Sequence, residues 1–301
     1  MRRSLMASLL AGSLITTALL TSPASAAPTT DTEPSVETAH NTATTAELDA
    51  FWTPERIRDA VPLDAPPAGP RLGSPAPPST ADADEILVPG SAPTGDVGTT
   101  GIVETTGRLF FSSNGGTYVC TATVIAGNNK SMLATARHCG FGSGGTNYRF
   151  APSFNNNNAP HGWWDWRSAG WVNGGDGIEY DFAFVVLNTQ NGRYVTDVVG
   201  SGGLAFNAGH GHYMRVVGIP ASTNNVTSCE GQAHTGPSNQ YLLNNCNGLS
   251  GGASGGSWLI NWNGNNGGYQ VGTYFGSYGS AAAGSYFGDA AHGVWNGAQN
   301  S

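Results

Sequence analysis

Charged side chains are scarce in this sequence. Asp, Glu, Lys and Arg make up only 11% of its 301 residues, and Lys130 is the single lysine. A coiled coil needs many Glu and Lys residues, and a nucleic-acid-binding protein usually presents a basic face, so the composition excludes both classes. Disorder along the whole chain is excluded as well, because 8 Trp, 10 Tyr and 11 Phe provide many large apolar side chains.

Long hydrophobic runs are also missing, except at the N-terminus. Residues 1–26 combine Arg2 and Arg3 with an apolar stretch and the small-residue sequence Ala24-Ser25-Ala26. This pattern predicts a secretory signal peptide with its cleavage site, and it favours that interpretation over a membrane anchor. No second long apolar run follows. We therefore expect a secreted, extracellular protein that has no membrane association once the signal is removed.

Residues 27–100 form an acidic, proline-rich segment that contains no cysteine. Residues 51–61 are the one stretch with the pattern of a short helix. Because the segment contains so little apolar surface, we expect it to lack a packed structure of its own. Two roles are open. The segment is either a pro-segment that is removed when a zymogen matures, which we favour, or a permanent linker.

Residues 101–301 have the composition of an all-β domain. Short apolar runs alternate with turn sequences such as Asn114-Gly115 and Asn263-Gly264, and the length suffices for two small barrels. A short C-terminal helix is predicted through Phe287, Val294 and Trp295. The predicted strands are residues 108–111, 117–126, 131–136, 182–187, 213–219, 240–243, 257–260 and 269–275.

The four cysteines all lie in this domain, at positions 120, 139, 229 and 246. In an exported chain they predict two disulfides, for which three pairings are possible. A metal site is not predicted, because the sequence has neither a close pair of cysteines nor a histidine cluster at ligand spacing. We predict no cofactor either.

Three short segments carry residues suited to nucleophilic catalysis. They are TARHC (135–139), YDFAFVVL (180–187) and GLSGGASGGSW (248–258), and they contain His138, Asp181 and a serine. A serine hydroxyl is a poor nucleophile near neutral pH unless a base removes its proton. Imidazole suits that role, and a buried carboxylate can orient it. Glycines beside the serine allow backbone N–H groups to converge on a developing oxyanion.

These segments resemble the catalytic regions of the chymotrypsin-fold (trypsin-like) serine peptidases, in the same order along the chain. The resemblance extends over about residues 108–280, and it is closest to the secreted bacterial branch that includes the glutamyl endopeptidases. It implies two antiparallel β-barrels packed together. It also implies that a Cys120–Cys139 disulfide closes the hairpin before the histidine, and together with the flanking strands it predicts Cys229–Cys246 as the second pair.

The resemblance implies a role for each residue of the three segments. His138 is the general base, Asp181 orients it, Ser254 is the nucleophile, and the N–H groups of Gly252 and Ser254 form the oxyanion hole. An aspartate or glutamate nearby could replace Asp181 in this scheme, but an apolar run begins directly after Asp181. A second G-x-S-G-G sequence contains Ser250. We favour Ser254, because the apolar residues 258–260 follow it closely.

Two positions depart from the family pattern. The family's aspartate before the nucleophile is Ala253 here. In the animal enzymes that aspartate pairs with the N-terminal ammonium freed by cleavage, and this pair orders the site, so the same switch cannot operate in this chain. The other departure is Arg137, next to the histidine. It is either a surface ion-pair residue or a group that favours acidic substrates.

The resemblance also implies residues that bind the substrate. Gly248 lies at the floor of the specificity pocket, where no aspartate is present to bind Arg or Lys. Ser277, Tyr278 and Gly279 resemble the family's Ser-Trp-Gly strand, which pairs with the substrate backbone. Gly276 stands where glutamate-specific relatives have a histidine. By elimination, an apolar or aromatic preference is expected.

Four of the eight tryptophans lie within residues 161–171. We predict a loop there that is packed by its own aromatic side chains between the two barrels. The alternative is an aromatic rim on the substrate cleft.

The predicted protein is a monomeric, secreted serine endopeptidase that acts on proteins or peptides and binds no nucleic acid. Two alternatives are a non-catalytic binding protein with the same fold, and a wall- or carbohydrate-binding β-protein that uses the tryptophan segment.

Overall fold

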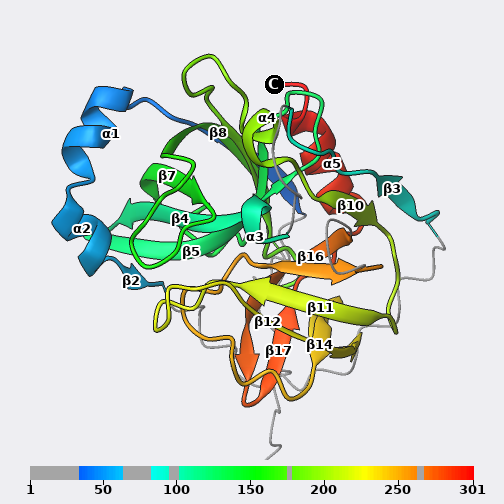
Figure 1. The fold of residues 1–301 in the computed structure, drawn as a ribbon. Helices are drawn as coiled ribbons and strands as arrows, with labels where there is room; N and C mark the ends of the chain where they lie inside the picture. The colour runs from blue at the N-terminus through cyan, green and yellow to red at the C-terminus, as the bar shows by residue number, and fades with distance from the viewer. Residues whose placement is uncertain (1–33, 64–82, 95–101, 175–177, 263–267) are drawn as a thin grey trace, which may run out of the picture. The chain divides into compact units, whose positions relative to one another are not determined.

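The computed structural model describes residues 34–63, 83–94, 102–174, 178–262 and 268–301 (Figure 1). The predicted signal peptide, residues 1–26, lies outside the described residues. Within the described ranges, none of the helices has both the length and the apolar character needed to cross a membrane.

Residues 106–187 form a closed six-stranded antiparallel barrel. Strand β8 pairs with both β7 and β9, and this pairing closes the ring in the order β4-β5-β6-β9-β8-β7. The interior is filled by large side chains, among them Phe150 and Trp164, which are almost fully buried. The strands are β4 (Thr106–Ser113), β5 (Gly116–Ile125), β6 (Met132–Thr135), β7 (Thr146–Pro152), β8 (Trp164–Asn173) and β9 (Ala183–Leu187).

The later strands form a half-barrel around Tyr241, Trp258 and Tyr274. Its strand order is β12-β11-β15-β16-β17-β14-β13, and β10 pairs with β16 in parallel. Together with the closed barrel, this arrangement confirms the predicted all-β, two-barrel fold. The strands are β10 (Gly203–Phe206), β11 (Tyr213–Gly218), β12 (Thr227–Gln232), β13 (His234–Thr235), β14 (Tyr241–Leu243), β15 (Ser257–Ile260), β16 (Tyr269–Tyr278) and β17 (Ala281–Gly284).

Short helices lie around the barrels: α3 (Ile102–Thr105), α4 (Val195–Val199), the 3₁₀ turn η1 (Pro237–Asn239) and α5 (Asp289–Ala298). Helix α5 is the predicted C-terminal helix. Its buried Val294 and Trp295 pack with Phe287 and Phe206 of β10. The Trp295 indole N–H also donates to the carbonyl of Ala126 at 2.9 Å, so α5 is tied to the closed barrel.

The tryptophan-rich segment is a barrel strand, so the prediction of a loop there is wrong. Residues 164–173 form β8, and Trp164, Trp166 and Trp171 are buried in the core of the closed barrel. The strand is hard to recognise in the sequence because polar and apolar residues do not alternate strictly along it. They do not alternate because most positions of the strand are buried. The buried positions also leave these three side chains unavailable as an exposed aromatic rim.

Both predicted disulfides are confirmed. Cys120 pairs with Cys139, with Cα atoms 6.2 Å apart, and Cys229 pairs with Cys246 at 5.6 Å. Each bridge closes a loop of similar length, with sequence separations of 19 and 17 residues. By restricting the unfolded chain, each contributes about 3 kcal/mol to stability.

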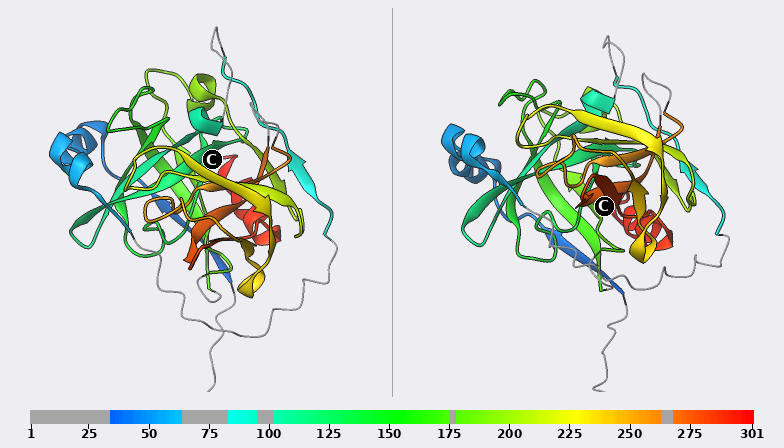
Figure 2. Two further views of the ribbon diagram at one scale, coloured as in Figure 1. Left: turned by 60° about the horizontal axis from the view of Figure 1, so that its bottom comes forward. Right: turned by 90° about the horizontal axis from the view of Figure 1, so that it is seen from below.

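Part of the acidic segment has a defined structure, contrary to expectation. It forms β1 (Ser35–His40), α1 (Thr45–Phe51), α2 (Pro54–Asp59), β2 (Val61–Pro62) and β3 (Ile86–Val88). Figure 2 shows β1 beside the closed barrel, where its six residues pair antiparallel with β8. Most side chains of β1 stay exposed, so the backbone hydrogen bonds hold this strand in place. The segment packs against the surface of the barrel and does not form a core of its own. Composition alone does not reveal this.

Trp52, which follows helix α1, anchors the segment to the barrel. Its side chain is 4% exposed and meets the ring of Phe110 at a centroid distance of 5.6 Å. Its indole N–H donates to the carbonyl of Asn147 at 2.7 Å. Nearby, Asp49 forms an ion pair with Arg149 at 2.7 Å. Residues 34–63 are therefore docked through two strands, β1 on β8 and β2 on β5, and through the side chains of Trp52 and Asp49.

We expect Trp52→Ala to release this segment, because burying a tryptophan is worth about 3 kcal/mol or more. Limited proteolysis should then cut within residues 34–63 much faster than in the parent protein. Val36→Ala is the matched control, since Val36 lies in the same segment but is 62% exposed. Equal cleavage rates for Trp52→Ala and Val36→Ala would contradict the anchoring role.

Candidate active site

His138 and Asp181 form a tight pair at the ends of strands of the closed barrel. His138 follows β6, and Asp181 precedes β9, which is paired with β6. The backbone N–H of His138 donates to Asp181 Oδ1 at 2.8 Å, and the ring Nδ1 lies 2.8 Å from Oδ2. Both carboxylate oxygens are thus used to fix one histidine, in its position and in the orientation of its ring.

Burial strengthens this pair. The Asp181 side chain is completely buried and the His138 side chain is 7% exposed. The Asp181 carbonyl accepts a hydrogen bond from Thr273 Oγ1 of β16 at 2.8 Å, so the half-barrel also holds this residue. On the far side of the imidazole, Nε2 is buried and has no hydrogen-bond partner among the described residues. Nε2 is therefore available to accept a proton.

Ser254 lies at the tip of a tight turn before β15. The turn is closed by a hydrogen bond from Gly256 N to Ala253 O at 2.9 Å. The Ser254 carbonyl accepts from Thr121 N of β5 at 2.7 Å, and it lies 3.9 Å from Cys139 Sγ, directly after the histidine. The alternative Ser250 is exposed, whereas Ser254 is 4% exposed and adjoins the histidine loop. Of the two serines, Ser254 is therefore the one whose turn lies against Cys139, the residue after His138.

The glycines of this turn are required by its geometry. Gly252 and Gly255 have φ of +92° and +83°, a region that other residues seldom adopt. A Cβ on Gly255 would collide with the Thr121 carbonyl oxygen and with Thr135 Oγ1. The turn thus packs directly on β5 and on β6, the strand that precedes His138.

A metal site is not formed beside the histidine. Cys120, Cys139 and His138 bring possible ligand atoms within 4.8 Å of one another, which is close enough to hold an ion. Both sulfur atoms, however, belong to the Cys120–Cys139 disulfide, and a disulfide sulfur is not a thiolate ligand. The bridge instead fixes the histidine loop to strand β5.

Tyr274 of β16 contacts the serine turn. It lies before residues 277–279, which the sequence pattern predicted to pair with the substrate backbone. Gly255 N donates to Tyr274 O at 2.8 Å, and the ring of Phe275 meets that of His138 edge-on at 5.7 Å. Ser277 and Tyr278 lie farther along β16, where they bond Tyr274 and Gln240, and Gly279 is in the turn to β17. Gly248, the predicted pocket floor, is exposed in a turn before Ser254.

Arg137, next to the histidine, takes part in none of the ion pairs found in the part of the chain that the structure describes. Its Nη1 donates to the carbonyl of Val172 in β8 at 3.1 Å. This bond ties the histidine loop to a barrel strand.

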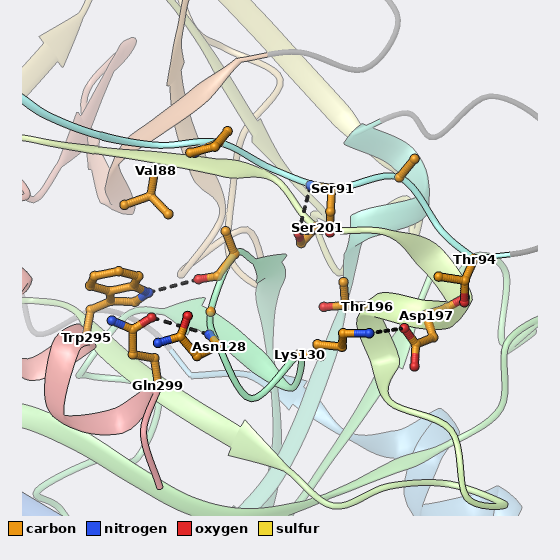
Figure 3. Close-up of a pocket in the computed structure, with 14 residues that line it drawn as sticks. Val88, Ser91, Thr94, Asn128, Lys130, Thr196, Asp197, Ser201, Trp295 and Gln299 are labelled. Atoms are coloured by element: carbon orange, nitrogen blue, oxygen red, sulfur yellow. Dashed lines mark hydrogen bonds and ion pairs between the residues drawn. The ribbon is translucent and has the colours of Figure 1, made fainter.

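A cavity of about 500 Å³ lies elsewhere on the protein, beside helices α4 and α5 (Figure 3). The chain that follows β3 forms one wall through Val88 and Ser91, and the Lys130–Asp197 ion pair lies at one side. His138, Asp181 and Ser254 are not among its lining residues. The cavity is therefore separate from the candidate site.

Solved structures of two bacterial proteases are similar to this chain. The first is the protease Anisep from Arthrobacter nicotinovorans, with 33% identity and a TM-score of 0.61 over 67% of this chain and 99% of that protein. The second is the thermostable serine protease AL20 from an extremophilic microorganism, with 35% identity and a TM-score of 0.59 over 66% and 98% of the two chains. No family model and no curated protein sequence matches the chain.

We expect Gly255→Ala to lower the free energy of unfolding by about 3–5 kcal/mol, because it adds both a steric clash and positive-φ strain. Gly279→Ala is the control. It has a φ of +61° but no atom within 4 Å of an added Cβ, so only about 1–2 kcal/mol of strain is expected. Urea unfolding measures both. Similar losses for the two variants would show that the serine turn does not pack closely on β5 and β6.

Proposed function

The chain belongs to the chymotrypsin-fold serine proteases, and we propose that it is a secreted endopeptidase that uses Ser254, His138 and Asp181 as its catalytic triad. One observation carries this proposal. The fully buried carboxylate of Asp181 binds both the backbone and the ring of His138, the other ring nitrogen has no hydrogen-bond partner among the described residues, and the turn of Ser254 lies against Cys139, the next residue.

In the proposed reaction, Ser254 Oγ attacks the carbonyl carbon of the scissile peptide bond while His138 Nε2 takes the hydroxyl proton. The carbonyl π electrons move to oxygen, and the N–H groups of Gly252 and Ser254 stabilise the resulting oxyanion. When the intermediate collapses, the C–N bond breaks and the leaving amine takes the proton from His138. Water then hydrolyses the acyl-enzyme by the same steps, which returns the proton to Ser254.

Asp181 serves this reaction through geometry and charge. Its contact with Nδ1 keeps the proton of neutral imidazole on that nitrogen, so that Nε2 carries the lone pair that faces the substrate side. When the imidazolium forms, the buried carboxylate stabilises it without reorganisation. Because Asp181 is held by its hydrogen bonds on both sides, the histidine does not have to be ordered by the substrate.

The two alternative functions have less support. A non-catalytic binding protein of this fold has no need to keep a buried carboxylate aligned on a histidine beside a strained serine turn. A carbohydrate-binding protein would need exposed tryptophans, but Trp164, Trp166 and Trp171 are buried in the barrel core.

We assign the strand that pairs with the substrate backbone to residues 275–276. They directly follow Tyr274, whose backbone N–H and carbonyl are both bonded to the serine turn through Gly256 and Gly255, and Phe275 lies against His138. Residues 277–279, which the sequence pattern suggested, lie farther along toward the hairpin turn. In this arrangement Phe275 covers the histidine on the substrate side.

We infer that the acidic segment assists folding and does not block the active site. The hydrogen bonds, ion pairs and ring contacts of residues 34–63 with the barrels go to strands β4, β5, β7 and β8 and to Asn147, whereas His138, Asp181 and Ser254 have other partners. A segment that docks on the barrel wall stabilises the barrel without occupying the site. Two disulfides fit export to an oxidising compartment, as the predicted signal peptide requires.

We expect Ser254→Ala and His138→Ala each to lower kcat/KM on a peptide ester by about 10⁴-fold or more. The double variant should lose little beyond either single one, because the two groups act as a unit. Ser250→Ala is the control, since Ser250 occupies an equivalent G-x-S-G-G position but is exposed. Loss of activity in Ser250→Ala with retention in Ser254→Ala would overturn the assignment of the nucleophile.

We also expect acetylation of the mature N-terminus to leave activity nearly unchanged, and the pH–rate profile to lack an alkaline decline caused by loss of an N-terminal ammonium. Ala253 has no carboxylate with which such an ammonium could pair. Lys130 is the single lysine, so the Lys130→Arg variant leaves the α-amine as the one amino group to acetylate. A large loss of activity after acetylation of this variant would show that the free amine orders the site through another acid.

A further inference from the structure

Arg108, in the middle of strand β4, is a fully buried cation at the junction of the two sheets. Its guanidinium donates hydrogen bonds to four oxygens of the half-barrel. Nη1 binds the carbonyls of Ile219 at 2.6 Å and Gly252 at 3.1 Å. Nη2 binds the carbonyl of Pro220 at 3.3 Å and Asn224 Oδ1 at 2.5 Å. Among the ion pairs of the described residues, none includes Arg108.

A buried cation without a carboxylate is costly to keep. Burial lowers the pKa of Arg108 to about 9, so the side chain is still charged at neutral pH. Arg149, on the neighbouring strand β7, shows how a buried cation is usually compensated: it forms ion pairs with Asp165 and Asp49, each at 2.7 Å. If Arg108 served packing alone, an apolar side chain would fill the same space without this cost. The arrangement therefore calls for a role that depends on its hydrogen bonds.

Those hydrogen bonds converge on the peptide groups of the proposed oxyanion hole. The Gly252 carbonyl accepts from Arg108 and also from Thr121 Oγ1 at 2.9 Å, so it is held toward the interior. The preceding carbonyl, of Gly251, accepts from Ala221 N at 2.8 Å. In a trans peptide the N–H points opposite to the carbonyl, so this bond directs the Gly252 N–H away from Ala221. Both peptide planes around Gly252 are thus fixed.

Arg108 controls both of these planes. It binds the Gly252 carbonyl directly. It also holds the loop that contains Ala221, through the carbonyls of Ile219 and Pro220 and the side chain of Asn224. The fit is close, because a Cβ on Gly252 would lie 3.0 Å from Arg108 Nη1 and 2.8 Å from Ala221 N. Moving the guanidinium would therefore release the Gly252 peptide at two points.

We propose that Arg108 is a positioning residue that holds the Gly252 N–H in the orientation that stabilises the oxyanion. This inference rests on the proposed function. Arg108 orders the oxyanion hole in place of the ion pair that animal members of the family form at the residue before the nucleophile. That residue is Ala253 here, which is buried and uncharged and cannot form an ion pair. A cation built into strand β4 is present as soon as the barrels fold, so the donors are in place without any contribution from a newly formed N-terminus.

The test compares Arg108→Gln and Arg108→Lys with the matched control Arg149→Gln, which removes another buried arginine from the same barrel. Active sites are first titrated, so that kcat refers to folded enzyme. The transition-state probe is a peptidyl trifluoromethyl ketone. Ser254 Oγ bonds to its carbonyl carbon, the hydroxyl proton passes to His138, and the carbonyl electron pair moves to the oxygen that occupies the hole.

For Arg108→Gln we expect kcat to fall by about 10–100-fold while KM changes by less than about 3-fold. The inhibition constant of the ketone should rise by the same factor as kcat/KM falls. Arg108→Lys should recover part of the loss, since an ammonium supplies a cation but not the planar fork. Arg149→Gln should lower the melting temperature without changing kcat or the inhibition constant.

The proposal is overturned if folded Arg108→Gln keeps kcat and the inhibition constant within about 3-fold of the native values, whatever its melting temperature. If Arg108→Gln does not fold, Thr121→Val decides, because it removes the other donor to the Gly252 carbonyl. The same kinetic pattern is expected there at smaller size, and unchanged values refute the proposal. Failure of the native protein to react with an active-site serine reagent would instead refute the proposed function.

Discussion

The hydrogen bonds of Thr121 join the two sheets at the proposed catalytic site. Its N–H donates to the Ser254 carbonyl at 2.7 Å, and its hydroxyl donates to the Gly252 carbonyl at 2.9 Å and accepts from Ile219 N at 2.9 Å. Its carbonyl accepts from Thr135 Oγ1, three residues before His138. One residue of β5 thus places the serine turn and the histidine strand in register. The geometry of the proposed triad depends on this junction, since neither sheet carries all three residues.

Two fully buried charges, Asp181 and Arg108, contact the proposed site. The carboxylate meets a histidine and the guanidinium meets backbone carbonyls, so each charge is compensated by hydrogen bonds rather than by solvent. In the proposed reaction one supports a forming imidazolium and the other holds the donors for a forming oxyanion.

The acidic segment shows how a stretch without its own core acquires structure. Strand β1 takes its order from the backbone of β8, and Trp52 is buried among side chains of the barrel. Both interactions require a folded barrel, which is why composition suggested an unpacked segment. The same dependence agrees with the proposed role of this segment in folding.

The sequence alone was sufficient for the features carried by local pattern. Apolar runs between turn signals marked β4, β5, β9 and β15, and the motifs pointed to His138 and Asp181, which the structure pairs, and to Ser254, whose turn lies against Cys139. Only the tertiary structure revealed the partners of those residues. Arg108 within an apolar strand was a visible signal, but its partners lie more than 100 residues away in the other sheet. Which residues of β16 lie beside His138 could not be predicted, because this depends on the strand register. A bulge between Tyr274 and Gly276 shifts that register. Contacts between distant segments are set by the packing of the two sheets, and local sequence carries no record of that packing.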